Sequence, residues 1–208
     1  MDSTRPTVVA LPQASISLAG EVLGRAFFDD PLWKWVLPDD DRRRRVLGWF
    51  MGVGVHYGHV YGTVHATTPA LEGCAVWLPP GDSGFLPERA VAFGLGEALE
   101  RLGSAAVERF DSAMGHLGAF HPQLVPEDHW YLMILGVEPA RQRQGLGGAL
   151  LQPMLARADR EGLRCYLETQ KPVNVPFYQA HGFEVAAETD VPGDGPHFWL
   201  MARTPRAR

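Results

Sequence analysis

The segment spanning residues 129–161 constrains the fold most. It begins with a near-continuous apolar run, His129–Val137, which is typical of a strand buried on both faces. A loop with one proline and several glycines follows, and a helical pattern then runs over residues 145–161 and stops at Gly162. A buried strand that leads through such a loop into a helix predicts a sheet covered by helices.

Similar patterns recur along the chain. Strands are expected at Thr7–Ala10, 61–65, Gly73–Leu78, His129–Val137, Arg164–Thr169, 183–189 and 197–202. Helices are expected at 15–28, 33–36, 42–53, 145–161 and 175–181, and two more within 87–118 with a break near 102–104, before a loop at 122–128. Internal repeats and linker-like composition are missing. The pattern therefore predicts one domain of the α/β or α+β class with a mixed sheet.

Composition excludes several classes of protein. A formal net charge of -5 over 208 residues argues against general nucleic-acid binding, and the longest apolar run is too short to span a membrane. The N-terminus lacks a signal-peptide pattern, which predicts a cytoplasmic protein. Cys74 and Cys165 have no metal-ligand or redox spacing and are expected to be reduced core residues.

One of the expected helices begins with a run of charged residues. Three aspartates at 39–41 supply capping oxygens, and four arginines at 42–45 follow them. An arginine run can bind nucleic acid, but here it is interpreted as one solvated helix face beside its own aspartates.

The loop after the central strand contains the residues that indicate a ligand-binding site. Gly145, Gly147 and Gly148 stand where the helix begins, so successive backbone N–H groups can converge on one anion. Arg141 and Arg143 add cationic donors, which favours a phosphate or pyrophosphate ligand. A tight turn alone would also explain the glycines. The Walker loop is excluded because no lysine follows, and the dinucleotide fingerprint fails at Leu150.

A family resemblance rests on the same residues. The stretch from Gln142 to Gly147, placed after a strand, resembles the acyl-CoA loop of the GCN5-related N-acetyltransferase (GNAT) superfamily. Leu167 to Thr169 resembles the fifth strand of that fold, and Asn174 to Tyr178 the helix after it. Within the superfamily the sequence motifs are most similar to those of puromycin N-acetyltransferase and its relatives, as in Ala-Val-Trp-Leu-Pro at residues 75–79.

The resemblance implies a single acyl-CoA N-acyltransferase domain over residues 1–208. Residues 6–128 would form the N-terminal strands and substrate-side helices, and 129–203 the acetyl-CoA-binding core. The sheet would be mostly antiparallel, flanked by helices and splayed between its fourth and fifth strands. Cofactor binding is implied for Leu135, Gly136, Val137, Gln142, Arg143, Gln144, Gly145, Leu146, Gly147, Gly148 and Asn174.

The resemblance also implies direct attack of an amine on the thioester. The backbone N–H near Val137 would stabilise the acyl oxygen, and Gly136 would mark the bulge where the strand opens. Tyr178 matches the residue that protonates the leaving thiolate, although a core aromatic would show the same pattern. Asn174 either caps its helix or binds the pantetheine arm.

The base that takes the proton of the amine is less clearly indicated. Glu168 ends a buried strand next to the expected splay, so it either accepts that proton or is a strand-end carboxylate exposed to water. Weaker candidates are His129, Glu127, Tyr131 and His121.

The sequence thus predicts an acetyl-CoA-dependent N-acetyltransferase that acts on a primary amine of a small molecule, with no metal, nucleic acid or membrane partner. A homodimer is compatible with the resemblance. Two alternatives stay open: a non-catalytic acyl-CoA-binding sensor or interaction module, and a nucleotide-binding protein. Aromatic and histidine side chains on the N-terminal helices either line the acceptor pocket or form core: Trp33, Trp35, Phe50 and His56.

Overall fold

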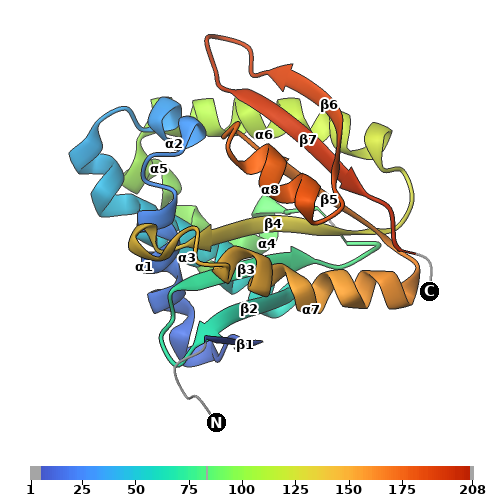
Figure 1. Cartoon of the computed structure of the whole chain (residues 1–208). Coiled ribbons are helices and arrows are strands. Elements are labelled where there is room, and N and C mark those ends of the chain that lie inside the picture. Colours follow the sequence, from blue (N-terminus) through green and yellow to red (C-terminus); the bar gives the residue numbers. More distant parts are fainter. Residues whose placement is uncertain (1–5, 83, 207–208) are drawn as a thin grey trace.

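The computed structural model describes residues 6–82 and 84–206. Its seven-stranded sheet has the order β1-β2-β3-β4-β5-β7-β6, and every neighbouring pair is antiparallel except β4 and β5, which are parallel (Figure 1). The strands are β1 (Thr7–Ala10), β2 (Thr63–Thr68), β3 (Gly73–Leu78), β4 (His129–Val137), β5 (Arg164–Thr169), β6 (Glu184–Asp190) and β7 (His197–Arg203). A mixed, mostly antiparallel sheet is confirmed.

Helices cover both faces of this sheet. They are α1 (Ile16–Ala26), α2 (Pro31–Val36), α3 (Asp40–Tyr61), α4 (Pro87–Ala90), α5 (Ala98–Leu102), α6 (Ser104–Leu124), α7 (Leu146–Glu161) and α8 (Asn174–Ala180). In Figure 1, α7 runs along one face while α1 and α3 lie on the other. Short 3-10 turns join several of these elements.

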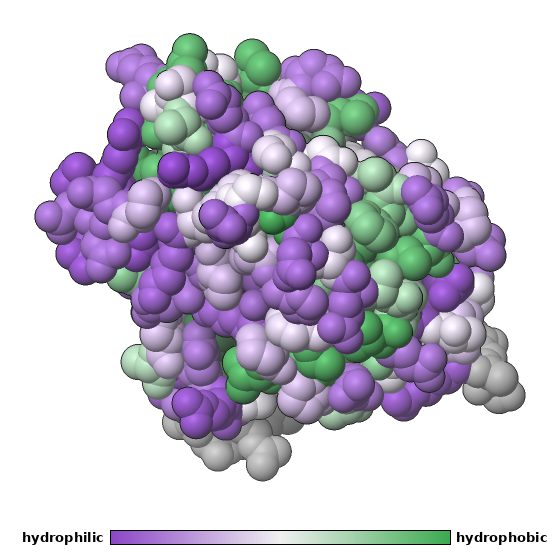
Figure 2. Space-filling view, turned by 90° about the horizontal axis from the view of Figure 1, so that it is seen from above, coloured by the Kyte–Doolittle hydropathy of each residue, from purple (hydrophilic) through white to green (hydrophobic). Residues whose placement is uncertain are grey.

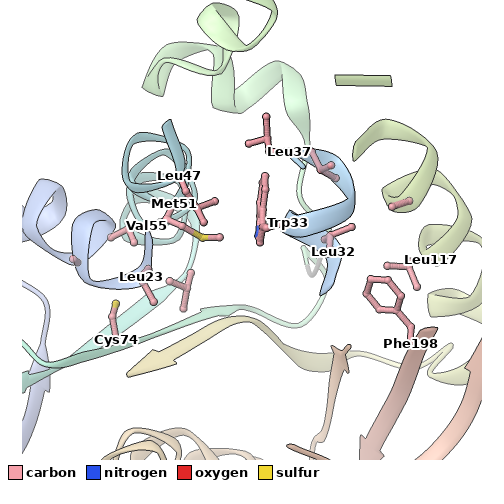
Figure 3. Packing of buried hydrophobic residues seen from close by; sticks show 14 of the residues in the cluster. Leu23, Leu32, Trp33, Leu37, Leu47, Met51, Val55, Cys74, Leu117 and Phe198 are labelled. Carbon is pink, nitrogen blue, oxygen red and sulfur yellow. The ribbon is translucent and has the colours of Figure 1, made fainter. Parts of the chain in front are cut away.

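Two hydrophobic cores result from the alternation of side chains along the strands. Cys74 and Val76 of β3 pack with α1, α2, α3 and α6, whereas Ala75 and Trp77 pack with α7 and α8. Figure 3 shows the first of these cores, where Trp33 of α2 lies between the α3 side and the side that contains Phe198. The sheet is thus buried on both faces in its centre.

Glycines allow α1 and α3 to pack closely. A Cβ atom at Gly20 would lie 2.7 Å from the carbonyl oxygen of Gly48, and one at Gly24 would lie 2.7 Å from the Gly48 Cα. Any side chain at these positions would push the two helices apart. Part of the glycine content of the chain, 23 of 208 residues, therefore serves this helix contact.

Several sequence-based boundaries are wrong: β2 ends at Thr68 rather than at residue 65, and residues 87–124 form three helices where two were expected within 87–118. The helix expected to reach residue 53 continues to Tyr61. Its last turns pack closely on the sheet because Gly58 has no side chain: a Cβ there would lie 2.1 Å from Val76 Cγ1. The following strand consequently starts at Thr63 rather than at residue 61. Likewise, α6 continues through Pro122 to Leu124, since a proline in the last turn removes only one intrahelical bond.

Arg43 also departs from its interpretation as part of a solvated face. Its side chain is 1% exposed and donates from Nε to the carbonyl of Phe28 and from Nη1 to that of Leu37. The same guanidinium pairs with Asp40. Arg43 therefore holds the chain between α1 and α3 in place.

The two cysteines are buried, and the surface is of mixed polarity. Cys74 and Cys165 are fully buried and unpaired, as expected, and burial raises the pKa of each thiol to about 12. Viewed from above β6, β7 and α6, the surface mixes hydrophilic areas with hydrophobic patches (Figure 2). Within the described residues, none of the helices combines the length and apolarity needed to cross a bilayer.

Candidate active site

The sheet opens between β4 and β5. These strands pair only from His129 to Tyr131 on β4, opposite Arg164 to Tyr166 on β5, and their later residues have no partner across the gap. The divergence borders a cavity of about 980 Å³. The splay expected between the fourth and fifth strands is present, and it places the ends of both strands at one cavity.

The irregularity in β4 does not lie at Gly136. Gly136 pairs regularly with Cys74, while the register between β3 and β4 shifts around Met133, which has no partner between Leu132 and Ile134. The prediction of a bulge at Gly136 is therefore wrong. A Cβ at Gly136 would lie 2.6 Å from Leu23 Cδ2, so the glycine instead allows α1 to approach the strand.

Backbone N–H groups near the end of β4 face the opened side. The N–H of Glu138 donates to the carbonyl of Glu72 (2.7 Å) on the β3 side. Because N–H groups alternate between the two edges of a strand, those of Val137 and Leu135 point away from β3. Consistently, the Val137 carbonyl accepts a hydrogen bond from Gln142 Nε2 (3.1 Å). This edge of β4 can therefore donate to an acyl or amide oxygen.

The 142–148 loop leads from β4 to α7. Residues 142–145 are exposed, and the backbone is left-handed at Arg143 (φ 59°) and again at Gly145 (φ 83°), which precedes the first turn of α7. Left-handed residues before a helix start turn N–H groups toward a common point, as anion sites do. Gln144 anchors the loop by donating from Nε2 to the carbonyl of Ala140 (3.2 Å).

The other loop residues have packing roles as well. A Cβ at Gly147 would lie 3.2 Å from the Phe177 ring, and one at Gly148 would lie 3.0 Å from His181 Nε2. The absence of side chains at both glycines therefore allows α8 to pack closely against the start of α7. The Leu146 side chain is buried, which leaves only its backbone for a ligand. Arg141 lies 3.1 Å from the carboxylate of Glu72, so its charge is largely compensated, whereas Arg143 is exposed.

Tyr178 lines the cavity from α8. The side chain is 6% exposed and packs against Phe177 and Phe183. Burial, and secondarily the charge of Asp30, raise the pKa of the hydroxyl, which stays protonated at neutral pH. The residue is thus both a core aromatic and a proton-bearing group at the cavity.

Glu168 lines the same cavity from β5, beyond the last residue pair of β4 and β5. The Tyr131 hydroxyl donates to its carboxylate at 2.8 Å, and burial raises the pKa of Glu168 to about 7. Burial, and secondarily the Glu168 carboxylate, raise the pKa of the Tyr166 hydroxyl. A carboxyl group with a pKa near neutrality can both accept and release a proton in the physiological range.

A pair of histidines adjoins this carboxylate network. His121 of α6 stacks on Tyr166 with ring centroids 4.1 Å apart, and its Nε2 lies 2.7 Å from Nε2 of His129. The other ring nitrogen of His129 contacts the carbonyl of Glu127 (2.7 Å). Burial lowers the pKa of His121 to about 4 and also lowers that of His129, so both rings are neutral at pH 7.

Asn174 does not cap its helix. It is the first residue of α8, and its side-chain amide donates to the Thr169 hydroxyl (2.9 Å) rather than accepting from a backbone N–H. The capping alternative is therefore wrong. The residue lines the cavity near the end of β5.

Sequence reasoning does not identify Asp30 as a site residue. The side chain is 3% exposed, lines the cavity and caps α2 by accepting from the Leu32 N–H (3.0 Å). Burial raises its pKa to about 6, against a smaller opposing effect of Lys171. The only signal was an N-cap pattern before Pro31, which does not reveal burial.

The cavity also includes aromatic residues of the N-terminal helices. Trp33 and Phe50 line it and also pack in the hydrophobic core, so the core interpretation is confirmed and a role in an acceptor pocket stays a prediction. Trp35 packs against the core and His56 stacks on Phe93, and neither lines the cavity. Within residues 6–82 and 84–206, no three histidine, cysteine or acidic side chains cluster as metal ligands would.

Comparisons with known proteins agree with this geometry. The family model described as "Acetyltransferase (GNAT) family" matches residues 83–183, a range that includes β4, the 142–148 loop, β5 and α8. A Schizosaccharomyces pombe protein, described as an uncharacterized N-acetyltransferase, is 27% identical over 170 residues, which cover 79% of this chain and 69% of that protein.

Solved structures share the fold. A Corynebacterium glutamicum protein, described as histone acetyltransferase HPA2 and related acetyltransferase, superposes with a TM-score of 0.72 at 24% identity, with 98% of each chain covered. The PaiA N-acetyltransferase from Thermoplasma acidophilum, solved in complex with coenzyme A, superposes with a TM-score of 0.53 at 12% identity over 97% of this chain and 99% of that one.

Proposed function

We propose that this chain is an N-acetyltransferase of the GNAT superfamily and that it transfers an acetyl group from acetyl-CoA to a primary amine of a small molecule; the family model that matches residues 83–183 and the N-acetyltransferase relatives support this. One observation carries the proposal. At the splay of β4 and β5 lies a cavity lined by Tyr178, Glu168 and β4 residues as far as Leu135, and the exposed glycine loop follows the end of the same strand. A donor at the loop and an acceptor in the cavity would meet at the opened strands.

The donor would bind along the end of β4 and the start of α7. The loop residues Gln142, Arg143, Gln144 and Gly145, with the backbone N–H groups of residues 146–148, would hold the pyrophosphate. The pantetheine arm would lie along Leu135, Gly136 and Val137 and reach Asn174. When bound, acetyl-CoA supplies an activated thioester. The exposed left-handed positions and the outward N–H groups of β4 fit such a ligand.

Protein groups at the cavity would handle the protons. Glu168 would accept a proton from the ammonium of the acceptor, either directly or through one water molecule. The neutral nitrogen would form a bond to the acetyl carbon as the carbon–sulfur bond breaks, and would then lose its second proton, through water, to the Tyr178 oxygen that had protonated the sulfur. The N–H of Val137 would stabilise the negative charge on the acyl oxygen, and Tyr178 would give its proton to the leaving sulfur.

The test is an assay of thiol release. The protein is incubated with acetyl-CoA and a panel of primary amines, including puromycin because of the branch resemblance, while calorimetry measures CoA binding. We expect release of CoA with at least one amine, and intersecting initial-rate lines when both substrates are varied. Tight CoA binding without turnover across the panel would indicate a binding module instead, and parallel lines would contradict direct transfer.

A further inference from the structure

The charges around the cavity are of one sign. Among the described residues that line it there is no lysine or arginine. Six acidic residues line it: Asp30, Glu88, Asp111, Glu127, Asp128 and Glu168. A wall of this composition attracts cations and repels anions, and a cavity with low-dielectric walls focuses that field.

The six carboxylates differ in depth. Glu88, Asp111, Glu127 and Asp128 are exposed, and Glu127 lies 3.5 Å from Arg164 outside the cavity. Asp30 and Glu168 are the inner pair. The exposed group can raise the local concentration of a cation at the entrance, whereas an inner carboxylate can bind one with little competition from water.

The two inner carboxylates have different surroundings. Glu168 accepts a hydrogen bond from Tyr131 and belongs to the tyrosine and histidine network. Asp30 uses one oxygen to cap α2, and Lys171, the cation whose charge lowers its pKa, does not line the cavity. Asp30 is therefore a buried acceptor whose charge is not compensated from within the cavity.

Apolar rings also line the cavity. Trp33 stacks with Phe110 at 5.5 Å between centroids, and Phe50 contacts both rings at 4.8 and 5.0 Å. All three line the cavity. Such a cluster favours a hydrocarbon or aromatic body, and its ring faces also attract a cation.

We infer that the acceptor is a small amine that carries a second positive charge on an apolar chain, and that Asp30 binds this second charge while the reacting nitrogen approaches Glu168. The inference deepens the proposed function and rests on it. Asp30 thereby acts as a specificity-determining residue, and its cap on α2 fixes the orientation of its carboxylate.

Matched amines test the inference. The probes are a homologous series of unbranched α,ω-diamines, the monoamines of the same chain lengths, and the corresponding ω-amino acids, with kcat/KM from CoA release. We expect the best diamine to exceed its monoamine by about tenfold, as one additional charge-assisted contact would give, and the amino acid to react least. A monoamine equal to or better than its diamine at every length would overturn the inference.

Asp30→Asn separates charge from capping, because asparagine caps helices about as well as aspartate. The variant should lower the diamine-to-monoamine ratio from about tenfold to below about twofold. Glu108→Gln is the control: it removes one negative charge from an exposed position outside the cavity lining and should keep the ratio. A ratio that Asp30→Asn leaves intact would contradict the role of Asp30.

Binding without turnover distinguishes this inference from the proposed function. The probe is an unreactive dication, the α,ω-bis(trimethylammonium) alkane of the best length, compared with its singly charged analogue in a thermal-shift titration. Stronger stabilisation by the dication, lost in Asp30→Asn, supports the cation site even if no amine is acetylated. Equal binding of both probes, or acetylation of a lysine-containing peptide in preference to every free diamine, would overturn it.

Discussion

The proposed donor side of the splayed sheet, formed by the end of β4 and the 142–148 loop, offers a ligand mainly backbone N–H groups. The proposed acceptor side, formed by the cavity that residues of α2, α3 and α6 line, offers carboxylates and aromatic rings instead. A site made of backbone requires particular local conformations, so it marks the sequence with glycines at fixed spacing. A site made of side chains from separate elements leaves no local pattern, which is why Asp30 was missed.

The first test concerns Tyr178, which is proposed to act where the donor and acceptor sides meet. Tyr178→Phe removes the hydroxyl proposed to protonate the leaving sulfur and should lower kcat about a thousandfold, within the range for general acid catalysis. Calorimetry should show CoA affinity within about twofold of wild type, because the ring and its packing remain. Tyr61→Phe, outside the cavity lining, is the matched control. An unchanged rate in Tyr178→Phe would remove Tyr178 from the mechanism.

Glu168→Gln tests the acceptor side and should lower kcat/KM about a hundredfold. In the wild type, kcat/KM should fall tenfold per pH unit below about pH 7, where Glu168 becomes protonated and can no longer accept a proton. The variant should lose this acidic limb. Tyr131→Phe should move the limb to higher pH, since the lost hydrogen bond stabilised the charged form. A limb that persists in Glu168→Gln would assign the base elsewhere.

Asp30→Asn tests the proposed acceptor side through the stability of the protein rather than through the reaction rate. The pKa of Asp30 is about 6 in the folded state, above its ordinary value of 3.8, so the native chain binds more protons than the unfolded chain between these values. The free energy of unfolding therefore falls as pH rises through that window. The variant should be more stable than wild type by about 2 kcal/mol at pH 8 and by much less near pH 4, as measured by urea unfolding. A stability difference independent of pH would contradict the assigned burial cost.

Gly145→Ala gives the smallest expected effect and tests the donor side. Alanine has space there but must adopt φ 83°, at a cost of about 1 kcal/mol, which should raise KM for acetyl-CoA by about five- to tenfold. Gly162→Ala at the other end of α7 introduces similar strain at φ 69°, also with space for a Cβ, and should leave that KM unchanged. Equal effects of the two variants would show that strain alone, not loop geometry, is responsible.

The sequence predicted most of the fold because its strands and helices have strong local signals. β3, β4 and β5 have the expected bounds, and the break between α5 and α6 falls at Gly103 as expected. The errors share a cause. Arg43, Gly58 and Gly136 owe their roles to elements distant in the sequence, which local periodicity does not reveal.

The candidate site was predictable to a similar degree. Tyr178 and Glu168, chosen from separate motifs, do line one cavity, and their catalytic roles stay predictions. Asp30 required knowledge of which helices bury it, and the network of His121 and His129 required the contact between α6 and β4. Such arrangements arise only when the whole chain is packed.

The burial of the two cysteines has a practical consequence for every assay above. Each thiol is fully buried and has a pKa of about 12, so the reactive thiolate is scarce at neutral pH and out of reach of bulk reagents. Because the chain has no other cysteine, the native protein should give almost no background with a thiol-detecting dye. The dye would therefore report released CoA, and a slow additional signal from two thiols per chain would report unfolding in the same cuvette.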